Sequence, residues 1–161
     1  SGVDTFVGNI DNLATDPQLL YVQAGVVYWS TLKFDVGFIP RGAIVNSATL
    51  FLEQQRSTTR LTKLSKDSVV SAHAIVSATD PTTFEASGSL GRRIDGTAGT
   101  FSFELRHAAQ LWINGLNNGV LIRNTSLREF STFDLYTFYN QLASNPNLRP
   151  RLHIVYATEK K

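Results

Sequence analysis

The chain has 161 residues, a length that suits one domain with a sizeable buried core. Apolar residues make up 42% and charged residues 17%, a balance that excludes an intrinsically disordered chain. The net charge is only +2, without a dense basic stripe, which argues against a nucleic-acid-binding protein. The absence of cysteine excludes a disulfide scaffold and a thiolate metal site. No apolar run reaches the roughly 20 residues of a membrane span.

Short runs of apolar and β-branched residues, separated by turn residues, recur along the chain. They predict strands at residues 19–24, 26–36, 44–53, 68–77, 99–103, 119–124, 131–139 and 152–157. Many short strands at this spacing are typical of a sandwich or jelly roll. We therefore predict an all-β fold, a jelly-roll-like antiparallel β-sandwich with one short helix. We expect a single module over residues 1–158, followed by a tail or linker remnant at 159–161.

The predicted helix covers residues 106–112. Its spacing places Ala108, Leu111 and Trp112 on one face, and Gly115 follows as a helix terminator. Because the three side chains on this face are apolar, we expect Trp112 to belong to the core and not to a binding surface.

Two blocks of sequence, in a fixed order, carry a resemblance to a known family. Residues 39–52 read IPRGAIVNSATLFL, and residues 149–156 read RPRLHIVY. With Asp4-Thr5-Phe6-Val7 at the start, this order resembles the DNRLRE-type domain, which includes carbohydrate-binding modules attached to polysaccharide lyases and archaeal disaggregatase-related proteins. The resemblance implies a jelly-roll sandwich in an exported, often multidomain protein, secreted or at the cell surface. Some such domains bind acidic polysaccharide such as alginate, and others belong to surface or matrix proteins.

One predicted strand carries the residue types of a sugar site. A sugar site needs an aromatic ring that stacks on the pyranose, and acidic sugars also need Arg or Lys for their carboxylates. Alternation along residues 26–36 places Trp29, Thr31 and Lys33 on one face of the strand. The alternative is that Trp29 packs under a loop or against the second sheet.

Basic residues gather in two segments that are predicted to be loops, where binding groups often collect. The first segment contributes Arg56, Arg60 and Lys63, and the second contributes Arg92 and Arg93. Such loops could clamp an anionic polymer. Ordinary solvated charge is the alternative, and the sequence favours it.

Closely spaced oxygen-bearing side chains near the start of the chain suggest a calcium site. They include Asp4, Asn9, Asp11 and Asp16, and hard oxygen ligands on a loop suit Ca²⁺. Their spacing does not match an EF-hand, and turn and cap hydrogen bonds of Asx residues are the favoured interpretation. A structural calcium is therefore the alternative, and no other cofactor is expected.

Catalytic patterns are missing from the sequence. It contains no nucleophile elbow, no paired-histidine zinc motif and no phosphate-binding glycine loop. Several acidic residues could serve a glycosidase, but nothing in the sequence selects a pair. We therefore expect no enzyme, but a non-catalytic extracellular carbohydrate-binding module with an acidic polysaccharide as its partner. The alternative is a structural or adhesive module of a cell-surface, matrix or filament protein, attached to a larger chain or self-assembling.

Overall fold

Strands dominate the computed structural model of the chain, which describes residues 16–25, 28–61, 70–94, 99–125 and 133–158. Strands account for 44% and helices for 9%. The strands form three antiparallel sheets. This confirms the prediction of an all-β sandwich with one short helix.

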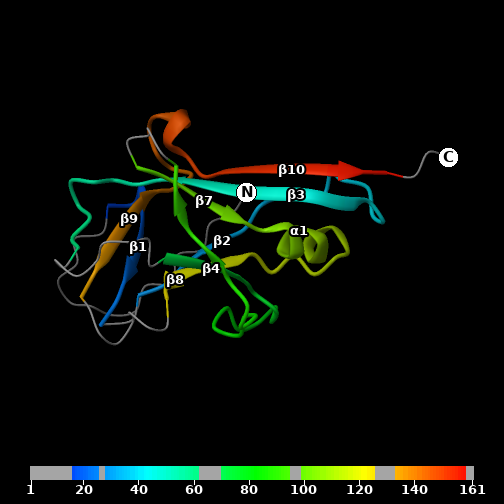
Figure 1. Cartoon of the computed structure of the whole chain (residues 1–161), viewed down its shortest axis with the longest axis horizontal. Coiled ribbons are helices and arrows are strands. Elements are labelled where there is room, and N and C mark those ends of the chain that lie inside the picture. The colour runs from blue at the N-terminus through cyan, green and yellow to red at the C-terminus, as the bar shows by residue number, and fades with distance from the viewer. Residues whose placement is uncertain (1–15, 26–27, 62–69, 95–98, 126–132, 159–161) are drawn as a thin grey trace.

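Two four-stranded sheets form the layers of the sandwich (Figure 1). The first has the order β10-β3-β7-β6, built from β3 (Ile44–Glu53), β6 (Arg92–Arg93), β7 (Thr100–Glu104) and β10 (Arg151–Ala157). The second has the order β2-β8-β4-β5, built from β2 (Ser30–Leu32), β4 (Val70–Ala74), β5 (Ser89–Leu90) and β8 (Val120–Asn124). Neighbouring strands in both sheets are mostly distant in sequence, so the chain crosses repeatedly between the layers.

The two ends of the sandwich are covered by different elements (Figure 1). A two-stranded sheet of β1 (Leu19–Gln23) and β9 (Leu135–Tyr139) lies at one end. Helix α1 (Arg106–Ile113) lies at the other end. A short 3₁₀ helix, η1 (Pro146–Leu148), precedes β10, and Asn145 caps it by accepting a hydrogen bond from the Asn147 N–H.

The core lies between the layers, where β3 turns every second side chain inward and the longer strands of the second sheet are buried almost throughout. Leu50 and Leu52 in β3 are paired with Phe103 and Phe101 in β7, and all four side chains are fully buried. Phe101 also meets Phe138 of β9 edge to face at 5.4 Å, which joins the end sheet to the same core. Complete burial of each such side chain stabilises the fold by about 1.5–3 kcal/mol.

Helix α1 packs its apolar face on this core. Ala108, Trp112 and Ile113 are buried, so the prediction of Trp112 as a core residue is confirmed. The helix ends where Gly115 takes a φ of +101°, a left-handed conformation that glycine adopts without a Cβ penalty. The N–H of Leu116 then returns to the carbonyl of Leu111 at 2.9 Å.

The predicted strand at residues 26–36 is much shorter in the structure, where β2 has three residues. After Leu32 the chain leaves the sheet. The Asp35 carboxylate accepts the Gly37 N–H at 2.8 Å, and the Ile39 N–H bonds the Val36 carbonyl at 3.0 Å. These local hydrogen bonds turn the backbone, so side-chain turn chemistry overrides the apolar pattern that suggested a longer strand.

Candidate functional site

Trp29 is half-buried and packs against the segment between β4 and β5. Its ring meets the Phe84 ring edge to face at 5.7 Å. The Arg123 guanidinium carbon lies 4.9 Å from the centre of the Trp29 ring and 5.1 Å from that of Phe84. Part of the Trp29 side chain therefore packs under a loop, as the alternative interpretation proposed. Beside it lies a hollow of only about 60 Å³, which Thr31 also lines, with room for about two water molecules.

Lys33 lines a different and larger cavity, of about 420 Å³, next to the C-terminal end of α1. Residues 33–41 supply one wall and residues 112–117 supply the other. Although Trp29 and Lys33 come from the same short segment, the buried Thr31 lies between them. The structure thus divides the three predicted strand-face residues between two hollows.

The two walls of the cavity are tied together by contacts of Phe34. Its carbonyl accepts a hydrogen bond from the Asn117 Nδ2 at 2.8 Å. Its ring packs on that of Trp112, with centroids 6.4 Å apart. These contacts hold the cavity open between a turn and a helix end, in positions fixed by the core.

The cavity is basic on balance, because Lys33 and Arg41 outnumber the one carboxylate in its lining, Asp35. Lys33 and Arg41 are both exposed, and no salt bridge between residues that the structure describes involves either of them. Phe38, whose side chain is 75% exposed, lies between two residues that line the cavity, Gly37 and Ile39. Cations without salt bridges among the described residues, in a segment that also exposes an aromatic ring, form a surface that suits an acidic sugar.

Two of the residues that line the same cavity have buried polar atoms without partners. Within the described part of the chain, Trp112 Nε1 and Asn117 Oδ1 are buried and make no hydrogen bond. Trp112 is only 3% exposed. Buried polar atoms are nearly always hydrogen-bonded in native proteins, so this pair needs an explanation.

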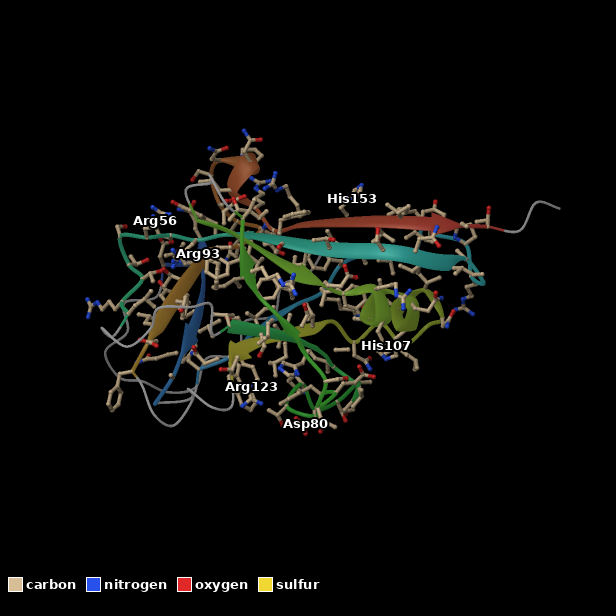
Figure 2. The ribbon with its side chains drawn as sticks, viewed as in Figure 1. Arg56, Asp80, Arg93, His107, Arg123 and His153 are labelled. Carbon is tan, nitrogen blue, oxygen red and sulfur yellow. The ribbon has the colours of Figure 1, made fainter. Side chains whose placement is uncertain are left out.

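Arg56 and Arg93 come together at the β1–β9 end of the molecule, as Figure 2 shows. Arg93 Nη2 donates to the Gln54 Oε1 at 3.2 Å, and the Arg93 guanidinium lies over the Phe101 ring at 5.4 Å. Arg56 lies next to the same Gln54 side chain, at Gly99. Both cations are exposed, and Arg93 is partly engaged by the protein itself.

Among the described residues, Arg60 and Arg92 are the other predicted basic residues. Arg60 forms an isolated bridge with Leu135, and Lys63 lies outside the described residues. Arg92 lies in β6 next to Arg93, so its side chain projects from the opposite face of the sheet. The prediction that Arg92 and Arg93 lie in a loop is wrong, because both pair with β7.

A second cleft, of about 340 Å³, lies at the N-terminal end of α1 and is acidic. Glu85, Glu104 and His107 line it (His107 is labelled in Figure 2). His107 Nε2 lies 3.0 Å from the Glu85 Oε1, and Glu104 Oε1 accepts the Arg106 N–H at 3.0 Å. The fold thus brings Glu85 and Glu104 to one cleft, a pair that the sequence alone could not identify. Each of these carboxylates has a partner within the protein.

Asp80 organises the turn beside Trp29 (Figure 2). Its carboxylate accepts the Thr82 hydroxyl at 2.6 Å, the Thr82 N–H at 2.9 Å and the Thr83 hydroxyl at 2.8 Å. Hydrogen bonds from Thr82, and then from Thr83, lower the pKa of Asp80 below its usual value of 3.8. The same turn brings Pro81 and Thr82 to the hollow beside Trp29.

Of the predicted calcium ligands, only Asp16 lies within the described residues, and Asp4, Asn9 and Asp11 lie outside them. Asp16 Oδ1 accepts the Gln18 N–H at 2.8 Å, which is the turn chemistry of the favoured interpretation. In the part of the chain that is described, no group of three or more His, Asp or Glu side chains is arranged to hold a metal ion. No helix there is long and apolar enough to cross a membrane.

Sequence reasoning found Lys33 but missed the other residues of the cavity. Arg41 stood in a motif that was interpreted as a turn, and Trp112 was assigned to the core. Phe38 offered a usable signal, because a large aromatic residue beside a Pro-Arg-Gly turn often lies on a loop surface. Asn117 offered none, because only the fold brings it to Phe34.

Comparison with known proteins leaves the family open. No family model matches the sequence, and no curated protein is similar to it. The resemblance to the DNRLRE-type domain therefore stays a prediction, and what is established for this chain is an antiparallel β-sandwich.

Proposed function

We propose that the chain is a non-catalytic, extracellular carbohydrate-binding module that holds an acidic polysaccharide at the cavity beside α1. One observation carries the proposal. Two cations without salt bridges among the described residues, Lys33 and Arg41, line one cavity of about 420 Å³. The family resemblance supports the same function and a secreted or cell-surface location.

The chemistry of the rim explains how such a polymer is held. Arg41 can bind a carboxylate through two parallel hydrogen bonds, while Lys33 acts as a point charge. Phe38 offers an exposed ring for the apolar face of a pyranose. Because both cations are exposed, we expect the affinity to fall as salt rises.

Calorimetric titration with alginate oligosaccharides tests the proposal after an initial array of acidic and neutral glycans. Lys33→Gln and Arg41→Gln should each weaken binding by about fivefold to tenfold, since each removes a charge-assisted contact. Arg106→Gln is the matched control, because Arg106 is an exposed cation of α1 that does not line this cavity. Absence of binding to every glycan on the array, or equal affinity of all three variants for alginate oligosaccharides, would refute the proposal.

Lack of catalysis is part of the same proposal. The carboxylates that share the acidic cleft, Glu85 and Glu104, are held by His107 and by the Arg106 N–H. We expect no shortening of alginate, pectate or neutral glucans during long incubation with the protein. Release of product by the wild type, and its loss in Glu104→Gln, would instead identify an enzyme.

The position of β10 at the edge of its sheet, as far as the described strands show it, favours a second candidate, a structural or adhesive module. This strand has seven residues and, among the described strands, pairs with β3 alone. An exposed edge can accept a strand from a neighbouring chain. Sedimentation at high protein concentration should then show ordered association that is lost in Val155→Lys. A strictly monomeric wild type would exclude this candidate and leave the first untouched.

A further inference from the structure

The interior of the basic cavity has its own hydrogen-bonding pattern. Trp112 Nε1 and Asn117 Oδ1 are both closed off from solvent and make no hydrogen bond to the described residues. Both residues line the cavity. An indole N–H can only donate a hydrogen bond, and a carboxamide oxygen can only accept one. Two residues that line the cavity thus hold one unused donor and one unused acceptor, both closed off from solvent in this structure.

The orientation of the Asn117 carboxamide is fixed by its other contact. Its Nδ2 lies 2.8 Å from the carbonyl oxygen of Phe34. Because a carbonyl oxygen only accepts, the NH₂ group must face Phe34, and the carboxamide oxygen is the atom left over. The unused acceptor therefore follows from the fold and does not depend on the choice of amide rotamer.

A group that complements one donor and one acceptor must both accept and donate. A hydroxyl does so, whereas a carboxylate only accepts and an ammonium only donates. We infer that Trp112 Nε1 and Asn117 Oδ1 bind a sugar hydroxyl at the cavity wall, while Lys33 and Arg41 bind the carboxylate at the rim. The occupant is then a hydroxylated acid, a uronate unit, and not a polyanion in general.

This inference rests on the proposed function and sharpens its specificity. A site built to bond a hydroxyl discriminates strongly against an analogue without one, because its own polar groups are then left unpaired. A polyanion without hydroxyls, such as poly-L-glutamate, satisfies only Lys33 and Arg41. Since the two atoms are closed off from solvent, a hydroxyl reaches them only after neighbouring side chains have moved.

The chain has two tryptophans, so an ¹⁵N–¹H spectrum contains two indole N–H signals. Trp29→Phe removes one and assigns the other to Trp112. Titration of this variant with oligomannuronate should move the Trp112 indole signal downfield, with saturation at the affinity that calorimetry gives. Poly-L-glutamate of equal charge should leave the signal in place.

Trp112→Phe provides a second measurement, because it keeps an aromatic ring against Phe34 but has no N–H. It should bind oligomannuronate about fivefold to tenfold more weakly than the wild type and bind poly-L-glutamate equally well. Its melting curve, compared with that of the wild type, checks that it folds.

The outcomes separate this inference from the proposed function. If oligomannuronate binds but leaves the Trp112 signal unmoved, or if poly-L-glutamate moves it equally, Trp112 Nε1 and Asn117 Oδ1 do not bind a sugar hydroxyl. The inference then fails while the proposed function stands. If calorimetry detects no binding of oligomannuronate or any other glycan, both fail.

Discussion

The Gln110 side chain in α1 accepts a hydrogen bond from the backbone N–H of Val45 in β3, at 2.9 Å. The same carboxamide donates to the carbonyl of Ala43 at 3.0 Å. Ala43 closes the turn that carries Arg41, since its N–H bonds the Pro40 carbonyl at 3.1 Å. One side chain therefore fixes the position of the basic rim relative to the helix.

Gln110→Ala should destabilise the protein by about 1–3 kcal/mol, because it removes two partly buried hydrogen bonds to backbone groups. Urea denaturation measures this loss. Gln110→Glu keeps the acceptor for Val45 and loses the donor to Ala43, so we expect an intermediate stability. Equal stability of Gln110→Ala and the wild type would show that these bonds contribute nothing net.

Gly119→Ala should be far more damaging than Gly115→Ala. Both glycines have positive φ angles, +92° and +101°, so alanine is strained at either position. A Cβ at Gly119 would also lie 2.6 Å from the Leu32 carbonyl oxygen, whereas nothing lies within 4 Å of a Cβ at Gly115. We expect a loss of about 1–2 kcal/mol for Gly115→Ala from backbone strain alone, and a clearly larger one for Gly119→Ala. Thermal denaturation of both variants is the test, and similar losses would contradict the clash.

Trp29→Ala should mainly affect stability. Its ring packs on Phe84 and under the Arg123 guanidinium, so its removal should cost about 2–3 kcal/mol, less than for a fully buried Trp. Since Trp29 does not line the basic cavity, alginate affinity should stay within about twofold of the wild type. Calorimetry and urea denaturation of one preparation provide both numbers. A large loss of affinity without a loss of stability would return Trp29 to the binding site.

Asp80 should make the turn at residues 80–83 sensitive to acid. Its folded pKa is lowered by hydrogen bonds from Thr82 and Thr83, so the carboxylate stabilises the fold above its unfolded pKa. That contribution is lost as pH falls from 3.8 through the lowered folded value. Carboxyl ¹³C titration should show a pKa below 3.8 in the wild type and a higher one in Thr82→Val. An unchanged Asp80 pKa in Thr82→Val would refute the assigned cause.

The sequence predicted the fold class well, because short apolar strands recur between turns and β3 alternates buried and more exposed side chains with a period of two residues. It predicted α1 to within one residue, as a helix face with Ala108 and Trp112 is distinctive. It overextended β2, since local hydrogen bonds at residues 35–39 turn the backbone after the strand. Such bonds are not visible in an apolar pattern.

The candidate site was only partly predictable. Lys33 was found because strand alternation places it on a face. Its partners Arg41 and Trp112 come from a turn and a helix that meet only after the sheets have packed. The predicted clusters of basic residues in loops were likewise only partly correct, because Arg92 and Arg93 lie in β6 and face opposite sides of the sheet.

Part of the basic cavity is built from core residues, and this restricts which of its residues can change among related modules. Ile39 and Trp112 line the cavity and also belong to the main hydrophobic cluster. A change that alters the selectivity of the wall therefore also costs stability, while Lys33, Phe38 and Arg41 can vary at little cost. Homologues should therefore keep the shape of the cavity and differ in the residues at its rim. New binding specificities would then arise from changes in the charge of the rim, while the pocket itself stays the same.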